Sequence, residues 1–507
     1  MDQSDPFDAI VIGAGYGGTT VAALLARAGK RVALLDKMPR AAGKVQWLDR
    51  RGYKIEAFGA VGVPAENSRF HELTELLGLG ERMEFIFPPG DMARVVYKSR
   101  EHGWRSMTTS LRPSEIGPDS MERMKQTLGV GDEDLMAMAG VYATAMAMSD
   151  EDFAALDDVS FADWLRPFNL PRVMVDHLGL TMNALFVVST DRLAASEAIF
   201  TLRQLVVGGA GRYHKGGFGR LAELCAEYVA EHGGVYLPGE TVEAILVEDG
   251  RAVGVRTRQG RELRAQCVIS NAGIQPTVLK LAGAAHFPAE YVERVERLEP
   301  SLSIAGCRYV FDTTVFEGAF ITIFSDAGHI DDANWARMTR GEWPEVMPIV
   351  IEVETAFDPE MSPIPGHQIA NFQVFVSPDP KSPMAEEAIE RAERVIEELY
   401  PTLKQHIVRR EPYGPRMISS MTRDAVLPGV GGEAVGLGQV VGQIGRHKPD
   451  PRTPLPGLYL VGCDAGFLNG TNKFSGIQSG LLSGSRLGFR GEEALGNGLK
   501  AVFTLEY

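Results

Sequence analysis

The stretch that decides the fold is FDAIVIGAGYGGTTVAALLARAGKRVALLDK, residues 7–37. Its residues 8–12 form a short apolar run, which is typical of a buried parallel strand. Gly13, Gly15 and Gly18 follow in a GxGxxG pattern. In this pattern the first glycine permits a tight turn, the second lets a pyrophosphate approach the backbone, and the third lets a helix pack closely on the strand.

The residues after the glycines complete a βαβ unit. Residues 19–28 read as a helix whose N-terminus directs free N–H groups toward the phosphates, and Gly29 is placed to end it. Residues 31–35 form the second strand. Asp36 stands at its end, 23 residues after Gly13, where an acid binds a ribose 2′-hydroxyl. The pattern predicts a dinucleotide site. It suits both FAD and NAD, since both carry an adenosine ribose.

Length and composition narrow the class of protein. The 507 residues suit more than one domain, and the net charge of -15 argues against a nucleic acid partner. The charge also disfavours attraction to anionic lipid, while peripheral apolar contact with a membrane stays open. Four widely spaced cysteines form no CxxC pair, and no apolar run approaches a membrane span, so we expect a cytoplasmic protein. The sequence does not specify an oligomeric state.

A second region, residues 213–273, extends the same domain. Leu221, Leu224, Cys225 and Tyr228 share one face of a predicted helix that ends at a pair of glycines. Several short strands and a return strand, CVISNAG, follow. This layout is more typical of a flavoprotein than of a simple dehydrogenase.

Three blocks carry a resemblance to a known family: residues 8–64, 212–273 and 456–484. The middle block, HKGGFGRLAELCAEYVAEHGG, is similar to a Pro-x-Gly-Gly-Met helix start, with His214 where proline is usual. The last block, GLYLVGCDAG, is similar to a closing strand with a flavin-contacting turn. The chain resembles the phytoene desaturase-like branch of the FAD-dependent amine oxidase superfamily, which includes carotenoid desaturases, carotenoid isomerases and retinol saturases.

The resemblance implies an α/β fold, in which a Rossmann-type FAD-binding domain is interleaved with an α+β substrate domain. The expected FAD segments are 1–78, 206–280 and 441–507. The expected substrate segments are 79–205, mostly helical, and 281–440, a sheet with a helix. We expect the FAD to be held without a covalent link, because Cys463 is the only histidine or cysteine in the C-terminal motif and precedes the Asp464 turn on its strand.

The cofactor contacts follow from the same motifs and the resemblance. Asp464 is expected near the ribityl chain or the pyrophosphate, and a helix starting near Ser475 is expected to direct its N-terminus at the flavin N1–C2 carbonyl, where reduced flavin is negative. The full expected set is Gly13, Gly15, Gly17, Gly18, Asp36, Lys37, Gly43, Lys44, Gly59, Val242, Asn271, Ala272, Gly462, Asp464, Gly476 and Ile477.

One segment departs from the family pattern. The family usually has Gly-Gly-Arg shortly after the ribose acid, whereas this chain has Ala42, Gly43 and Lys44. Lys44 is expected to offer a phosphate a point charge in place of a bidentate fork, with Arg40 as another source of a guanidinium. The segment AFGAVGVP, residues 57–64, is expected to pass close to the flavin ring.

The predicted substrate domain is apolar. Six methionines, residues 121–148, suit either the lining of a pocket for a long apolar molecule or an ordinary helix core. Four apolar runs between residues 301 and 377 predict a sheet that forms the floor of the substrate cavity. Residues 382–401 predict an amphipathic helix whose charged side faces solvent.

No residue pattern identifies a catalytic base. The sequence contains no GxSxG, no HExxH and no metal-ligand cluster, so we expect no metal, and we interpret His177, His214, His329 and His447 as structural. Arg308 and Tyr309, on a predicted strand, are weak catalytic candidates. A flavin needs little help to accept a hydride, so the cofactor is expected to carry the chemistry.

The preferred interpretation is an FAD-dependent oxidoreductase that desaturates, saturates or isomerises a C–C bond in an apolar isoprenoid, terpenoid or polycyclic substrate. The first alternative is an FAD-dependent amine oxidase. The second is a non-catalytic prenyl-binding protein of the GDP dissociation inhibitor type. The sequence leaves the substrate, the direction and the electron acceptor open.

Overall fold

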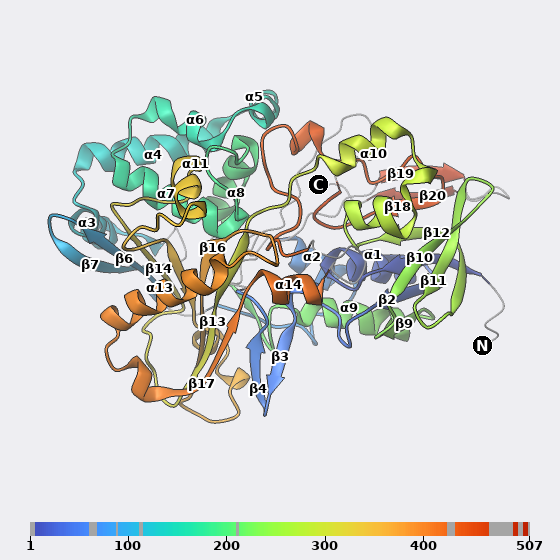
Figure 1. Ribbon diagram of the computed structural model, residues 1–507, viewed down its shortest axis with the longest axis horizontal. Helices are drawn as coiled ribbons and strands as arrows, with labels where there is room; N and C mark the ends of the chain where they lie inside the picture. The colour runs from blue at the N-terminus through green and yellow to red at the C-terminus, as the bar shows by residue number, and fades with distance from the viewer. Residues whose placement is uncertain are drawn as a thin grey trace.

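The computed structural model describes residues 6–59, 68–87, 90–110, 115–208, 212–422 and 431–465, and the strands at 490–494 and 500–504. Figure 1 shows an elongated molecule with one sheet on the right, a second sheet at lower left, and a group of helices above the second sheet. Helix α14 (Pro415–Met421) lies between the two sheets in this view.

The right-hand sheet has seven strands in the order β10-β11-β12-β1-β2-β9, with β18 also paired to β12. β1, β2, β9, β12 and β18 run parallel, whereas β10, β11 and the start of β12 form an antiparallel meander. The sheet thus joins strands from three distant parts of the chain. Its strands are β1 (Phe7–Ile12), β2 (Val32–Asp36), β9 (Val235–Pro238), β10 (Val242–Glu248), β11 (Arg251–Thr257), β12 (Glu262–Ser270) and β18 (Leu458–Leu460).

Helices α1 (Tyr16–Arg27) and α9 (Arg220–Glu231) pack against each other and against this sheet. α1 begins at Tyr16, three residues before the predicted start, so its first turn already contains Gly17 and the motif glycine Gly18. A Cβ on Gly18 would lie 1.9 Å from the carbonyl oxygen of Gly13, so only glycine allows this close packing of helix on strand. Gly29 follows the helix with φ of +74°, as its predicted role as a helix stop requires.

The second sheet also has seven strands, in the order β17-β13-β16-β15-β14-β6-β7. Every residue of β13 and of β16 is buried, which explains their nearly continuous apolar sequence. The amphipathic helix α13 (Met384–Leu399) covers one face of the sheet. The strands are β6 (Ala93–Ser99), β7 (Gly103–Thr109), β13 (Ser303–Phe311), β14 (Phe320–Ser325), β15 (Ile349–Glu352), β16 (Gln368–Val376) and β17 (Ile407–Tyr413).

The helical group is formed by residues 118–208. Of the six methionines between residues 121 and 148, Met138 is buried, whereas Met121, Met136 and Met146 are exposed to between 39% and 66%. These three therefore do not belong to a helix core, and they are not among the residues that line the cavity described below. The helices are α3 (Pro118–Leu128), α4 (Asp132–Ala147), α5 (Asp150–Ala155), α6 (Phe161–Leu165), α7 (Arg172–Phe186) and α8 (Ala195–Gly208).

The remaining elements are short. Within the described residues, no helix is both long enough and apolar enough to cross a membrane. The division into five domain segments remains a prediction. The short elements include β3 (Trp47–Arg50), β4 (Tyr53–Glu56), α2 (Arg69–Leu76), β5 (Phe85–Ile86), β8 (Tyr213–His214), α10 (Ala289–Glu296), α11 (Asp332–Thr339), α12 (Glu354–Phe357), β19 (Arg490–Ala494) and β20 (Lys500–Thr504).

Candidate cofactor site

A cavity of about 300 Å³ opens at the carboxyl ends of β1 and β2. This edge is where open parallel sheets bind their ligands. The first sheet contributes the glycine loop and Asp36 to its wall, while Ile304 of β13 and Ile418 of α14 line it from the other side. The cavity therefore lies between the two sheets and takes residues from both.

The glycine loop forms the phosphate-binding part of the cavity in the way its spacing predicts. Gly13 has φ of +92° at the turn that leaves β1. A Cβ on Gly15 would lie 2.8 Å from Nδ2 of Asn271, and one on Gly17 would lie 2.8 Å from Cα of Gly462. The loop thus leaves no room for side chains, and its backbone and the first turn of α1 face the cavity.

Asp36 lies at the end of β2 and lines the cavity. Its Oδ2 accepts a hydrogen bond from the Ala14 N–H at 2.6 Å, and its Oδ1 accepts one from the Met38 N–H at 2.7 Å. Burial raises the pKa of this carboxyl group, and the two N–H donors oppose the rise. The donors also fix the orientation of the carboxylate, which still has lone pairs for a ribose hydroxyl.

Both lysines near the motif are engaged by the protein. The Lys37 ammonium donates to the carbonyl oxygen of Ser420 at 2.7 Å. The Lys44 ammonium donates to the Glu433 carbonyl oxygen at 2.5 Å and lies 3.3 Å from Oε1 of the same residue. The expectation that Lys44 presents its charge to a phosphate is therefore not met by this arrangement, although both lysines border the cavity.

Arg40 does not supply the missing guanidinium to the cavity wall. Its guanidinium carbon lies 3.8 Å from the centroid of the Trp47 ring, and Arg40 is not among the residues that line the cavity. This cation–π contact with Trp47 stabilises part of the positive charge of Arg40.

The other expected contacts divide into three groups. Gly43, Gly59, Val242, Asn271, Ala272 and Gly462 all line the cavity. Gly18 and Asp464 do not; the Asp464 carboxylate instead accepts hydrogen bonds from the Ile274 and Leu437 N–H groups at 3.0 and 3.1 Å and so joins two loops. Gly62, Gly476, Ile477 and the predicted helix near Ser475 lie outside the described residues.

Arg308 and Tyr309 point to opposite faces of the second sheet. Arg308 lies on the same face of β13 as the cavity-lining Ile304, and its Nη1 donates to the carbonyl oxygen of Ala57 at 2.7 Å. Tyr309 faces α13, where its hydroxyl donates to Oε1 of Glu393 at 2.5 Å. Tyr309 is thus wrong as a catalytic candidate, because side chains alternate along a strand and only one of these neighbours can face the cavity.

The sequence analysis missed a group of buried polar side chains on the cavity face of this sheet. Its members are Glu56 of β4, Glu352 of β15, Glu354 of α12, and Asn371 and Gln373 of β16; below we refer to them as the acid cluster. The signal was present, since charged and amide residues interrupt otherwise apolar strands in IVIEVE and QIANFQVFVS. Such residues need partners when they are buried.

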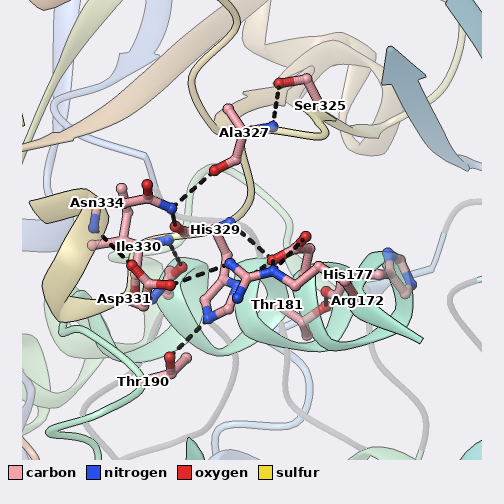
Figure 2. A network of polar contacts seen from close by, with 12 residues as sticks. Arg172, His177, Thr181, Thr190, Ser325, Ala327, His329, Ile330, Asp331 and Asn334 are labelled. Atoms are coloured by element: carbon pink, nitrogen blue, oxygen red, sulfur yellow. Dashed lines mark hydrogen bonds and ion pairs between the residues drawn. The ribbon is translucent and has the colours of Figure 1, made fainter. Parts of the chain in front are cut away.

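A separate polar network surrounds His329 (Figure 2). Its Nδ1 lies 2.7 Å from Oδ1 of Asp176, and its Nε2 lies 2.8 Å from Oγ1 of Thr190. All three side chains are buried, so this Asp–His–Thr arrangement joins α7 to the segment before α11 and offers no accessible nucleophile. Within the described residues, no group of three or more His, Cys, Asp or Glu side chains is arranged to hold a metal ion.

The fold and the cavity define a dinucleotide-binding oxidoreductase. A tight glycine loop, a helix N-terminus and an oriented acid at a strand end fit the adenosine diphosphate half of a flavin nucleotide, and the cavity continues beyond them to the second sheet. The chain belongs to the family of flavin containing amine oxidoreductases, which matches residues 16–486, and is therefore a flavin-dependent oxidoreductase.

Individual relatives specify the branch of this family. The chain is 25% identical to prolycopene isomerase 2 from an Oncidium hybrid cultivar, over 96% of this chain and 86% of that protein. It is 27% identical to a 4,4'-diapophytoene desaturase from Methylomonas sp., over 54% of this chain and 56% of that protein. A solved oxidoreductase from Methanosarcina mazei shares the fold, with a TM-score of 0.64 and 18% identity over 93% of this chain and 98% of that one.

Proposed function

We propose that the chain binds FAD without a covalent link and exchanges a hydride between the flavin and a C–C bond of an apolar, isoprenoid-type substrate. The observation that carries this proposal is the similarity to a prolycopene isomerase along almost the whole chain. The similarity to a diapophytoene desaturase, another protein named for an isoprenoid polyene, supports it independently. The flavin supplies hydride chemistry, and the chain's own residues bind and orient it.

The walls of the cavity support an apolar substrate. Beyond the glycine loop the cavity is lined by Phe58, Ile304, Ile418, Met421 and Val435. These side chains offer surface area and few hydrogen bonds, which suits a hydrocarbon. Desaturation, saturation and isomerisation all use one such site, so the direction and the electron acceptor are matters for experiment.

The described residues around the cavity support non-covalent binding. Among its described lining residues there is no histidine, and Cys463 is the one cysteine. The Cys463 thiol donates to Oδ1 of Asp464 at 3.3 Å and is thus already oriented by the protein. Acid precipitation of the purified yellow protein should release all of the flavin into the supernatant. Flavin that stays with the pellet would contradict the non-covalent link.

The reaction class is tested by mixing the oxidised protein, without oxygen, with a panel of linear terpenoid polyenes, steroids and amines. We expect the flavin absorbance near 450 nm to bleach, or product isomers to form, with a polyene. Bleaching by amines alone would favour the amine oxidase alternative. A purified protein that holds no flavin even when FAD is supplied would favour the non-catalytic alternative.

A further inference from the structure

Two members of the acid cluster, Asn371 and Glu352, stand in one row across the second sheet with Arg308. In the strand register, Arg308 of β13 lies opposite Asn371 of β16, and Asn371 lies opposite Glu352 of β15. Directly opposed residues point to the same face of a sheet. The row therefore shares the face on which Ile304 lines the cavity.

Hydrogen bonds connect pairs within the cluster, while Glu56 is coupled to Glu352 and Glu354 by charge. Asn371 Nδ2 donates to Oε1 of Glu354 at 2.7 Å, and Gln373 Nε2 donates to Oε1 of Glu352 at 2.8 Å. Glu56 accepts from the hydroxyl of Tyr213 and from the Phe218 N–H.

The network is nevertheless incomplete. Four buried polar atoms in and beside it have no hydrogen-bond partner in the structure: Glu56 Oε2, Glu354 Oε2, Gln373 Oε1 and Arg308 Nε. Buried polar atoms are normally paired. Each of these four atoms is therefore an acceptor or a donor that a water molecule or a ligand can use.

The charges in the cluster do not balance if every acid is ionised. Glu56, Glu352 and Glu354 are each no more than 3% exposed, and Arg308 is the cation that acts on Glu354. Arg308 is shared with Glu411, whose Oε2 lies 3.8 Å from its Nη2. Burial raises the pKa of Glu56 to about 8 and that of Glu354 to about 7. Burial of three carboxyl groups beside one shared cation therefore favours protonation of at least one of them near neutral pH.

The cluster lies directly behind one wall of the cavity. Phe58 and Gly59 line the cavity, and Arg308 binds the carbonyl oxygen of the preceding residue, Ala57. A Cβ on Gly59 would lie 2.4 Å from the unpartnered Oε1 of Gln373. The cluster is thus separated from the cavity by a single layer of backbone.

We propose that the acid cluster is the proton store of the cofactor site: it takes up and releases the proton that accompanies hydride exchange. The proposal rests on the proposed function and deepens it. When a CH–CH unit becomes C=C, one carbon gives a hydride to the flavin. The neighbouring carbon loses a proton, and the electron pair of that C–H bond becomes the π bond. A carboxylate of the cluster accepts the proton and becomes a carboxylic acid; saturation runs the same exchange in reverse.

Several titratable groups face Glu354 and Glu56 and set their protonation. They are Arg308 of β13, Glu352 of β15, Tyr413 of β17, Tyr213 of β8 and Tyr16 of α1. Arg308 is the cation among them. A negative charge gained in the cavity should therefore be met by proton uptake at the carboxyl groups.

The test counts protons on the FAD-loaded protein and needs no substrate. The flavin is reduced photochemically without oxygen in weakly buffered solution, and a pH indicator measures proton uptake per flavin between about pH 6 and 9. The wild type should take up more protons than the flavin alone accounts for. Glu354→Gln should lower this excess, and the double variant Glu56→Gln, Glu354→Gln should abolish it.

Glu393→Gln is the matched control, because Glu393 lies on the opposite side of the same sheet, where Arg410 binds it. Its proton uptake should equal that of the wild type. Equal uptake in the wild type, Glu354→Gln and the double variant would overturn the proposal. If the purified protein bound no flavin, the proposed function would be wrong. That outcome differs from equal proton uptake in a flavin-loaded protein, which would contradict the proton store alone.

A measurement on the wild type alone covers the case in which the variants do not fold. The infrared difference spectrum between reduced and oxidised protein should contain the C=O band of a protonated carboxylic acid, shifted in D₂O. A difference spectrum without such a band would also overturn the proposal.

Discussion

Glu56 ends strand β4 with its carboxyl group 1% exposed, and burial raises its pKa from the ordinary 4.5 to about 8. Between these two values the folded chain holds a proton that the unfolded chain has released. The contribution of Glu56 to the free energy of unfolding should therefore fall as the pH rises from about 4.5 to about 8, on the order of 1.4 kcal/mol for each unit of pKa difference, while buried His177 and His214, whose pKa values burial lowers, contribute in the opposite direction below about pH 6.5. Thermal unfolding of the wild type across this range measures the slope.

Glu56→Gln should remove this negative contribution, so the slope of the unfolding free energy against pH should be more positive than in the wild type. Glutamine keeps an acceptor oxygen for Tyr213 and Phe218 but does not titrate. Glu81→Gln, at an exposed position, is the control and should leave the slope unchanged. A Glu56→Gln slope as steep as that of the wild type would mean that this carboxyl group is ionised in the folded chain.

The sequence predicted the positions of some site residues and not of others. Gly13, Gly15 and Asp36 line one cavity as predicted, because their roles depend on a local βαβ unit. Glu56, Glu352 and Glu354 come from three separate elements, β4, β15 and α12, and lie near one another only in the folded chain. No local spacing connects them, so their shared burial was not predictable from the chain alone.

Helix α7 is held by the polar network of Figure 2, and its Gly179 touches the His329 ring. A Cβ at Gly179 would lie 2.3 to 2.7 Å from ring atoms of His329, which Asp176 and Thr190 hold in place. Gly179→Ala should therefore destabilise the chain by about 1–3 kcal/mol, the usual cost of overpacking. Chemical denaturation of the purified variant measures this loss.

Gly140 in α4 provides the comparison for that change, because a Cβ there meets nothing within 4 Å. Gly140→Ala should stabilise the chain by about 0.5–1 kcal/mol, since alanine loses less backbone entropy in a helix. If Gly179→Ala raised the stability as Gly140→Ala does, the His329 ring could not pack closely against Gly179 of α7.

At the level of elements, the four predicted strands of the second sheet and helix α13 were found close to their expected bounds. Strands β6 and β7 were not predicted, since the segment 79–205 was interpreted as mostly helical. β6 pairs in parallel with β14, more than 200 residues later in the chain. Such pairing leaves no signal in the local sequence, whereas the 3.6-residue period of α13 does.

The whole molecule surrounds its cavity with parts of both sheets, so a bound cofactor contacts the two at once. Gly15 and Asp36 come from the first sheet, and Ile304 comes from the second. FAD that binds only the folded chain should raise the unfolding free energy by about 2.7 kcal/mol at a hundredfold excess over its Kd. We therefore expect the melting temperature to rise with FAD concentration and both sheets to unfold in a single transition.

Two variants test which residues cause the stabilisation by FAD. Gly15→Val should remove the FAD-dependent rise, because a Cβ at this position already meets Asn271 at 2.8 Å and a branched side chain fills the phosphate loop. Asp36→Ala should weaken FAD binding by about 1–3 kcal/mol, the worth of hydrogen bonds to a charged group. Differential scanning calorimetry with FAD, and with NAD as the control ligand, measures both. A rise with NAD and none with FAD would assign the cavity to the nicotinamide cofactor, because the βαβ unit alone accommodates either dinucleotide and only the remainder of the cavity distinguishes them.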